Sequence, residues 1–286
     1  MQIDAATRLL GVIGMPVAHS LSPAMHNRAL AALGLNYAYL AFAVDPPRLA
    51  DAVRGLRVLG CAGFNVTIPH KETVMPLLDE VTPAARACGA VNCVCSREGR
   101  LIGHNTDGSG FVAALREAGV EPGGAVALVV GAGGAGRAVA FSLAEAGVSG
   151  LVVVDLQPQR AVGLADEVRA VRGISAHALH AADPALPQAV ASADLLVNAS
   201  PAGMHPDVDR MPLLPEWFRP GQVVADIVYT PRETRWLAEA RRRGLRTVDG
   251  VGMFVHQGAR SFELFTGQAA PVALMREVVC HHLQHG

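Results

Sequence analysis

A glycine-rich turn in the middle of the chain constrains the fold more than any other feature. An apolar run, Val126–Val130, leads into Gly131-Ala132-Gly133-Gly134-Ala135-Gly136, which fits the pattern G-x-G-x-x-G. A helical pattern over Gly134–Ala146 follows, and then a second apolar run that ends in Asp155. Asp155 follows the glycines by about 20 residues. This spacing is typical of a dinucleotide-binding strand–helix–strand unit. The sequence therefore predicts such a unit.

The residue types of this turn suit a phosphorylated cofactor. Glycines let the backbone approach a pyrophosphate, and the first turn of a helix offers unpaired N–H groups and a partial positive charge. A carboxylate at Asp155 can accept hydrogen bonds from both ribose hydroxyls of NAD and would repel the 2′-phosphate of NADP, while Arg160 could reach the ribose or the adenine. We therefore predict NAD rather than NADP as the cofactor. The candidate pyrophosphate contacts are Gly131, Ala132, Gly133, Gly134 and Ala135.

Apolar runs alternate with helical patterns on both sides of the turn. Before it, runs such as Leu9–Ile13 and Tyr37–Val44 flank the helical pattern Pro23–Leu33, and the chain closes with the helical patterns Phe254–Thr266 and Pro271–Leu283. This alternation predicts an α/β protein with mostly parallel strands. A length of 286 residues suits two domains. We place one domain at residues 1–106 plus 251–286 and the dinucleotide-binding domain at residues 107–250.

Composition excludes several classes of partner and site. The formal net charge is −1, and 51% of the residues are hydrophobic, which predicts a packed globular protein that binds neither nucleic acid nor an anionic membrane surface. No run approaches the ~18 apolar residues of a membrane span, and the N-terminus does not resemble a secretory leader. An odd cysteine count of five then favours free thiols and a cytoplasmic location. Cys88, Cys93, Cys95 and His104 fit no common zinc spacing, so we expect no metal site.

Polar residues in the N-terminal half suggest where chemistry could occur. A strand-like run continues into Asn65–Lys71, which places Thr67 and Lys71 at the carboxyl end of a strand, where ligands gather in open α/β sheets. Asp107 begins a helical pattern further along. Hydride transfer to a ketone needs a proton donor, and a partly desolvated lysine held by an aspartate can serve. The pattern alone fits a surface lysine and a simple helix cap equally well.

A series of short motifs runs in order from about Gly11 to the C-terminus. The motifs are Ser20–Pro23 with His26-Asn27, Asn65–Lys71, Gly89–Asn92, Asn105–Gly108, Gly131–Arg137, Asn198–Gly203, Tyr229–Pro231, Asp249-Gly250 and Gln257. Together they resemble the shikimate/quinate dehydrogenase family. The resemblance implies an N-terminal α/β substrate domain, a Rossmann-type doubly wound parallel sheet, and C-terminal helices that return to the N-terminal domain.

The resemblance also implies a role for each matching residue. Lys71 and Asp107 would form the catalytic pair, in which Lys71 donates a proton during ketone reduction and Asp107 holds its charge. Ile227 and Gly250 would approach the nicotinamide. The implied substrate contacts are Ser20 and Ser22 at the ring carboxylate, and Thr67, Asn92, Tyr229 and Gln257 at the ring hydroxyls or the carboxylate.

These expectations combine into a predicted function, the NAD-dependent, reversible oxidation of shikimate to its 3-dehydro ketone. Asp155 replaces the Asn-Arg-Thr type of segment of biosynthetic members and resembles the NAD-using quinate/shikimate branch. Ser22 is a serine where some quinate-using relatives have threonine, which favours shikimate and leaves quinate open. Three alternatives stay open: an NADP-dependent biosynthetic shikimate dehydrogenase, an aminoshikimate dehydrogenase, and a non-catalytic sensor of the ring acid. We expect a monomer or a homodimer.

Overall fold

The structure is a computed structural model that describes residues 3–285, and the chain divides into two compact units. The first unit comprises the chain up to Thr106 and again from Gln257 onward, and the second comprises Asp107–His256. Helix α9 (Gly250–Thr266) runs across the boundary, so the two units share one helix. The boundary that we expected after residue 250 falls at the first residue of this helix.

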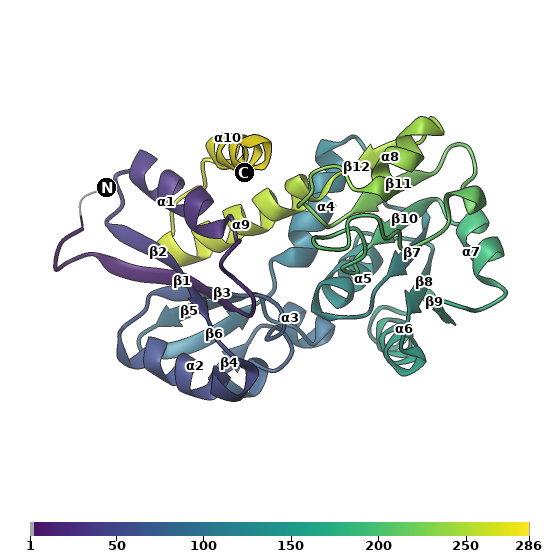
Figure 1. Ribbon diagram of the computed structural model, residues 1–286. Helices are drawn as coiled ribbons and strands as arrows, with labels where there is room; N and C mark the ends of the chain where they lie inside the picture. Colours follow the sequence, from purple (N-terminus) through teal and green to yellow (C-terminus); the bar gives the residue numbers. More distant parts are fainter. Residues whose placement is uncertain (1–2, 286) are drawn as a thin grey trace. The chain divides into compact units, whose positions relative to one another are not determined.

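The first unit is a mixed sheet covered by helices (Figure 1). Its further elements are β1 (Arg8–Gly14), α1 (Ser22–Ala32), β2 (Tyr37–Ala43), η1 (Pro46–Arg48), α2 (Leu49–Val58), β3 (Gly63–Val66), η2 (Met75–Leu77), β4 (Glu80–Val81), α3 (Pro83–Cys88), β5 (Cys93–Arg97), β6 (Arg100–His104) and α10 (Val272–His285). The strand order is β2-β1-β3-β5-β6-β4. β1 pairs in parallel with β2 and β3, whereas β5 runs antiparallel to β3 and β6.

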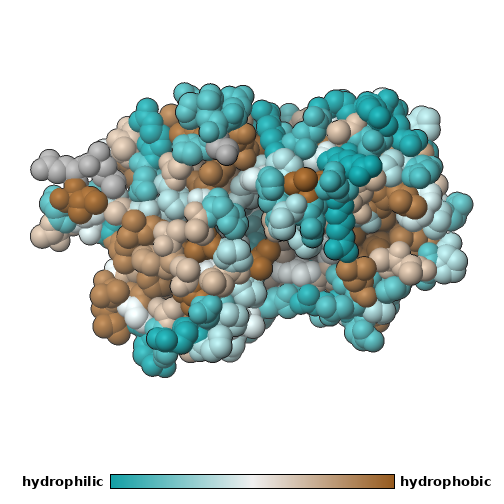
Figure 2. All heavy atoms as spheres, in the orientation of Figure 1, coloured by the Kyte–Doolittle hydropathy of each residue, from teal (hydrophilic) through white to brown (hydrophobic). Residues whose placement is uncertain are grey.

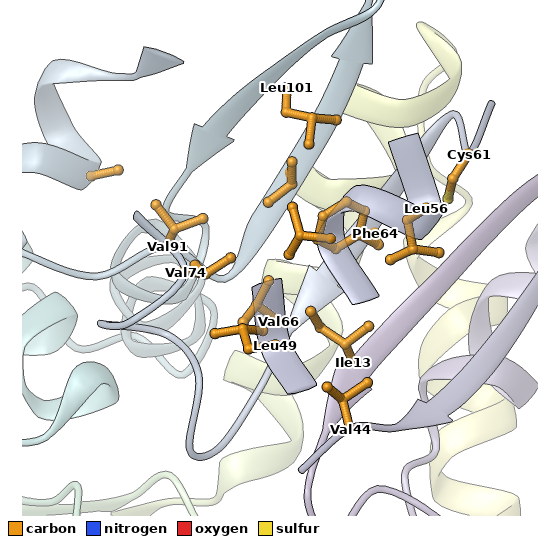
Figure 3. Close-up of a cluster of buried hydrophobic side chains, with 13 residues drawn as sticks. Ile13, Val44, Leu49, Leu56, Cys61, Phe64, Val66, Val74, Val91 and Leu101 are labelled. Carbon is orange, nitrogen blue, oxygen red and sulfur yellow. The ribbon is translucent and has the colours of Figure 1, made fainter. Parts of the chain in front are cut away.

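One face of this sheet is closed by α2. Leu49, Val53 and Leu56 recur at helical spacing on α2 and are all buried, as an amphipathic helix requires. They belong to one apolar cluster with Phe64 of β3 and Ile13 of β1 (Figure 3). Because Phe64 is completely buried in this cluster, α2 is fixed on the sheet by apolar packing.

The opposite face of the sheet receives the C-terminal helices. Gly63 neighbours Phe64 on β3, so its missing side chain would point the other way, and a Cβ there would collide with the ring of Phe265 on α9. The ring of Phe262 on the same helix lies 6.3 Å from that of His26 on α1. Helix α10 packs on α1. The predicted return of the C-terminal helices to the N-terminal unit is confirmed.

The second unit is built on an entirely parallel six-stranded sheet. Its elements, besides the start of α9, are α4 (Asp107–Glu117), β7 (Val126–Val130), α5 (Gly134–Glu145), β8 (Gly150–Asp155), α6 (Pro158–Arg172), β9 (Ser175–His180), α7 (Leu186–Ser192), β10 (Leu195–Asn198), η3 (Pro215–Trp217), β11 (Val223–Asp226), α8 (Arg235–Arg242) and β12 (Arg246–Val248). The strand order β12-β11-β10-β7-β8-β9 is that of the doubly wound dinucleotide-binding fold. The predicted Rossmann-type sheet is confirmed.

Large apolar side chains also reach the surface at isolated points. Val58 at the end of α2 is 81% exposed, and Leu59 beside it is 74% exposed. On the face shown in Figure 2, hydrophobic residues stand among hydrophilic ones. Within residues 3–285, no helix combines the length and the apolar character that a membrane crossing would need.

Candidate active site

The glycine-rich turn joins β7 to α5 at the carboxyl end of the parallel sheet. Gly131 has a φ of +105°, and a Cβ at this position would lie only 2.7 Å from the carbonyl oxygen of Ala199. A Cβ at Gly136 would collide with the carbonyl oxygen of Gly131, so both positions need glycine. At Gly133, which caps α5, an added Cβ would meet nothing within 4 Å. The turn therefore leaves open space beside the helix N-terminus, as a pyrophosphate site requires.

Asp155 ends β8 and is held by the backbone on both sides. One carboxylate oxygen accepts a hydrogen bond from the N–H of Ala132 at 2.7 Å, and the other accepts one from the N–H of Gln157 at 2.8 Å. The side chain thus ties the glycine-rich turn to the loop that leads into α6. Arg160 lies in the first turn of α6, where its N–H donates to the carbonyl oxygen of Gln157 at 3.0 Å.

The two residues predicted to approach the nicotinamide lie together. A Cβ at Gly250, the first residue of α9, would lie 2.6 Å from the carbonyl oxygen of Ile227, so the approach depends on glycine. The N–H of Ile227 donates to the carbonyl oxygen of Asn198 at 3.0 Å, which extends the β10–β11 pairing by one bond. The structure therefore brings Ile227 and Gly250 to the carboxyl edge of the sheet.

A buried carboxylate that the sequence analysis did not identify lies just before Ile227. Asp226 is 2% exposed and accepts hydrogen bonds from the N–H of Val228 at 2.9 Å, the amide of Asn198 at 3.0 Å and the hydroxyl of Thr234 at 2.8 Å. Burial raises the pKa of Asp226 to about 6, and the three hydrogen bonds only partly oppose this shift. An acid that ends the apolar strand β11 was the signal that could have identified it.

In the first unit, predicted substrate contacts meet in a polar cluster that is largely buried. The amide of Asn92 donates to the hydroxyl of Thr106 at 2.9 Å and to the amide oxygen of Gln257 at 3.4 Å. The N–H of Thr106 donates back to Asn92 at 2.7 Å, and the Thr106 hydroxyl lies 3.2 Å from that of Ser261. The structure therefore brings together Asn92 and Gln257, which are 165 positions apart in the sequence.

The remaining predicted residues of this unit lie on two short segments, one with Ser20 and Ser22 and the other with Thr67 and Lys71. The N–H of Ser22, the first residue of α1, donates to the Ser20 hydroxyl at 3.3 Å. Thr67 follows β3 directly, and its N–H donates to the carbonyl oxygen of Ile13 at 2.9 Å. The carbonyl oxygen of Lys71 accepts from the N–H of Val91 at 2.8 Å. This bond ties the segment that carries Lys71 to the residue before Asn92.

Two residues predicted for substrate chemistry belong to the second unit. Asp107 is the first residue of α4 and is 4% exposed. Tyr229 follows β11, with its ring 4.3 Å from that of Phe254, and burial raises the pKa of Tyr229 to about 12. Its hydroxyl is therefore neutral at physiological pH. The pairing of Lys71 with Asp107 stays a prediction.

Comparison with protein families and curated proteins gives consistent matches. Residues 12–94 match the shikimate dehydrogenase substrate binding domain, and residues 250–280 match the shikimate 5′-dehydrogenase C-terminal domain. The chain is 50% identical over 280 residues to the shikimate dehydrogenase (NADP(+)) of Moorella thermoacetica, covering 98% of this chain and 95% of that protein. It is 49% identical over 286 residues to the enzyme of the same name from Methanopyrus kandleri, covering 99% of each.

Solved structures give the same similarity. Shikimate 5-dehydrogenase from Listeria monocytogenes, in complex with shikimate and NAD, superposes with a TM-score of 0.90 at 36% identity, covering 97% of this chain and 98% of that one. Shikimate 5-dehydrogenase from Thermus thermophilus, in complex with NADP(H) and shikimate, gives a TM-score of 0.87 at 42% identity, covering 96% and 99%. This fold therefore accommodates either cofactor.

The prediction of NAD as the cofactor is wrong. Relatives at 43–51% identity, including the two described above, are named for NADP(+). The prediction assigned Asp155 to the ribose because it ends the second strand, but both of its oxygens bind backbone N–H groups of the turn and the following loop. A carboxylate with this structural role can occupy the strand end whichever nucleotide binds, so its presence does not discriminate between the two.

Proposed function

Because the chain belongs to the shikimate dehydrogenase family, we propose that it catalyses the NADP-dependent interconversion of shikimate and its 3-dehydro ketone. The chain is an NAD(P)-dependent oxidoreductase that acts on a CH–OH group of a small molecule. The observation that carries the choice of substrate is the hydrogen-bonded cluster of buried Asn92 and Thr106 with half-buried Gln257. These neutral amides and hydroxyls can donate to and accept from ring hydroxyls without adding charge.

In the proposed reaction the side chains of the protein carry the proton and the dinucleotide carries the hydride. NADP⁺ would supply the nicotinamide that accepts hydride from the hydroxyl-bearing ring carbon. During oxidation, the neutral amine of Lys71 takes the hydroxyl proton, and Asp107 stabilises the resulting ammonium. In the reverse direction Lys71 returns that proton to the ketone oxygen. Ser20 and Ser22 hold the ring carboxylate by donating their hydroxyl protons, and Thr67 and Tyr229 complete the contacts to the ring.

The second unit would hold the dinucleotide through neutral and cationic groups. The open turn at Gly133 and the N-terminus of α5 suit the pyrophosphate, and Ile227 and Gly250 suit the nicotinamide end. Arg160 is the first cation in the sequence after β8, and we assign it to the 2′-phosphate. An arginine fork is well matched to phosphate oxygens.

Initial rates with shikimate and quinate, each with NADP⁺ and with NAD⁺, test this proposal. Shikimate with NADP⁺ should give the highest kcat/KM, by about tenfold or more over NAD⁺. Lys71→Met keeps an unbranched side chain, one atom shorter, but removes the proton carrier, and should lower kcat by about 10²–10⁴-fold. The same variant should bind NADP⁺ with unchanged affinity in a fluorescence titration.

The cofactor, the catalytic role of Lys71 and the substrate can each be refuted by a different result. Faster turnover with NAD⁺ than with NADP⁺ would refute the cofactor, and more than a tenth of wild-type kcat in Lys71→Met would refute the role of the lysine. No turnover of shikimate or quinate with either cofactor would point to an amino-substituted ring acid, and, if that also failed, to a sensor.

We further propose that the enzyme works in the cytoplasm. All five cysteines are free thiols, and Cys61, Cys88, Cys93 and Cys95 are buried. Free cysteines that are not paired as disulfides suit a reducing compartment.

A further inference from the structure

The carboxylate of Asp226 joins two loops at the carboxyl edge of the parallel sheet. One of its oxygens accepts hydrogen bonds from the amide of Asn198, the last residue of β10, at 3.0 Å and from the N–H of Val228, just after β11, at 2.9 Å. The other oxygen accepts from the hydroxyl of Thr234 at 2.8 Å. Asp226, Asn198 and Thr234 are all at most 2% exposed, so these bonds are shielded from water.

Asn198 passes this connection on to the loop that follows β10. Its amide nitrogen donates to the carbonyl oxygen of Ala202 at 2.9 Å as well as to Asp226. Its amide oxygen accepts from the N–H of Ser200 at 3.1 Å and from the Ser200 hydroxyl at 2.7 Å. Because the side chain of Asn198 thus uses both N–H groups and both lone pairs, its orientation and the loop around it are fixed.

The loop after β10 lies against the glycine-rich turn. A Cβ at Gly131 would lie 2.8 Å from the carbonyl carbon of Ala199 and 2.9 Å from the backbone nitrogen of Ser200. The N–H of Ala199 donates to the carbonyl oxygen of Val130 at 2.7 Å. Backbone therefore meets backbone here, with no flexible side chain between them to absorb a shift. A displacement of the loop would displace the turn proposed to hold the pyrophosphate.

The segment after β11 meets the start of α9 in a similar way. A Cβ at Gly250 would collide with the carbonyl oxygen of Val228, whose N–H binds Asp226. Ile227, between these two residues, is a proposed nicotinamide contact. The carboxylate therefore supports the proposed pyrophosphate site through Asn198 and the proposed nicotinamide site through Val228.

We propose that Asp226 is a positioning residue for the dinucleotide, which holds the loops after β10 and β11 at the spacing that the cofactor needs. The inference rests on the proposed function. Neither Asp226 nor Asn198 is a proposed contact of either ligand, so the bond between them stays in place when the cofactor binds. Without the carboxylate, Asn198 and Val228 would each keep a buried N–H that lacks its acceptor, and the two loops would shift to find another one.

Asp226→Leu keeps the branched shape of the side chain but removes both oxygens, and Thr234→Val is its matched control. Thr234 is the N-cap of α8 and accepts from the N–H of Leu237 at 3.3 Å. Thr234→Val therefore removes one bond to the same carboxylate and destabilises the second unit, but leaves the bonds to Asn198 and Val228 in place. We expect the Kd of NADP⁺ in a fluorescence titration to rise about tenfold in Asp226→Leu and to stay within about twofold of wild type in Thr234→Val.

Two further measurements separate positioning from a general loss of structure. Asp226→Asn keeps an oxygen for Asn198 and Val228, and its amide can donate to the Thr234 oxygen, so it should restore the affinity for NADP⁺ to within about twofold of wild type. The calorimetric Kd of shikimate should rise no more than about threefold in Asp226→Leu, since most of its proposed contacts lie in the first unit.

Several results would overturn the inference. They are wild-type affinity for NADP⁺ in Asp226→Leu, an equal loss of NADP⁺ affinity in Thr234→Val or Asp226→Asn, and an equal loss of affinity for shikimate and NADP⁺ in Asp226→Leu. If Asp226→Leu does not fold, Asp226→Ala removes the oxygens without adding a large apolar group, and it must show the same loss.

Titration with NAD⁺ as well as NADP⁺ distinguishes failure of the inference from failure of the proposed function. Wild-type enzyme that binds NAD⁺ more tightly, or that binds NADP⁺ but does not oxidise shikimate, would refute the proposed function alone. In both cases the ratio of Kd values between Asp226→Leu and wild type, measured with the dinucleotide that binds more tightly, still tests the role of Asp226. Wild-type enzyme that binds neither dinucleotide would refute both.

Discussion

Asp226 is a carboxylate whose surroundings disfavour its charge. Its contacts are an amide, a hydroxyl and a backbone N–H, and burial raises the pKa of Asp226 to about 6. The pKa in the folded state thus exceeds the unfolded value of 3.8. Between these two values the folded state binds more protons than the unfolded state. The contribution of Asp226 to the free energy of unfolding is therefore full below about pH 4 and falls as the pH rises through 6.

Asp226→Asn, which does not titrate, isolates this effect. We expect the free energy of unfolding of wild type, relative to the variant, to fall by about 2 kcal/mol between pH 4 and pH 7. Urea unfolding followed by tryptophan fluorescence measures it, because both tryptophans, Trp217 and Trp236, lie in the second unit. Other carboxylates contribute to the pH dependence with the opposite sign, such as Asp194, whose pKa is lowered by the hydrogen bond from the N–H of Val126. Their contributions are the same in wild type and variant, so they cancel in the difference. A difference that is flat or rises with pH would contradict the prediction.

Elements buried on both faces were the ones that the sequence predicted best. The apolar run Val126–Val130 forms β7 with the same bounds, because a central parallel strand has no solvent-facing side to interrupt it with polar residues. β9, in contrast, is an edge strand that carries Ser175, His177 and His180, and its mixed pattern did not identify it. α7 has only seven residues, too few for a helical period to show. Both elements depend on packing against the sheet rather than on local pattern.

Two glycines of the glycine-rich turn are expected to have different roles, one in stability and one in cofactor binding, and two alanine variants can distinguish them. Gly136→Ala should destabilise the second unit by about 1–3 kcal/mol, because its Cβ would collide with the carbonyl oxygen of Gly131. Gly133→Ala should fold normally, since its φ of −80° suits alanine and its Cβ would enter open space. This variant should nevertheless bind NADP⁺ about tenfold or more weakly if a pyrophosphate occupies that space. Urea unfolding and NADP⁺ titration measure the two effects, and wild-type affinity in Gly133→Ala would place the pyrophosphate elsewhere.

Across the whole molecule, the sequence identified most of the proposed contacts but not the groups that support them. Contacts such as Asn92 and Gln257 lie in recognisable short motifs, whereas Ser261, whose hydroxyl accepts a hydrogen bond from the amide of Asn65, joins the N-terminal segments only by folding. Hydrogen bonds between residues so distant in the chain leave no local pattern. The cofactor was mispredicted for a related reason, because the backbone bonds of Asp155 form only in the folded turn.

Hydrogen exchange can test how the two ligands divide between the units. Each unit has an apolar core of its own, and the first is discontinuous, since the chain leaves it after Thr106 and re-enters at Gln257. Shikimate alone should therefore slow amide exchange in two distant segments at once, around Asn92 and around Gln257. NADP⁺ alone should slow exchange in the glycine-rich turn, and α2, which carries no proposed contact, should be unaffected by either ligand. Protection by shikimate of only one of the two segments would show that Asn92 and Gln257 do not act as one site.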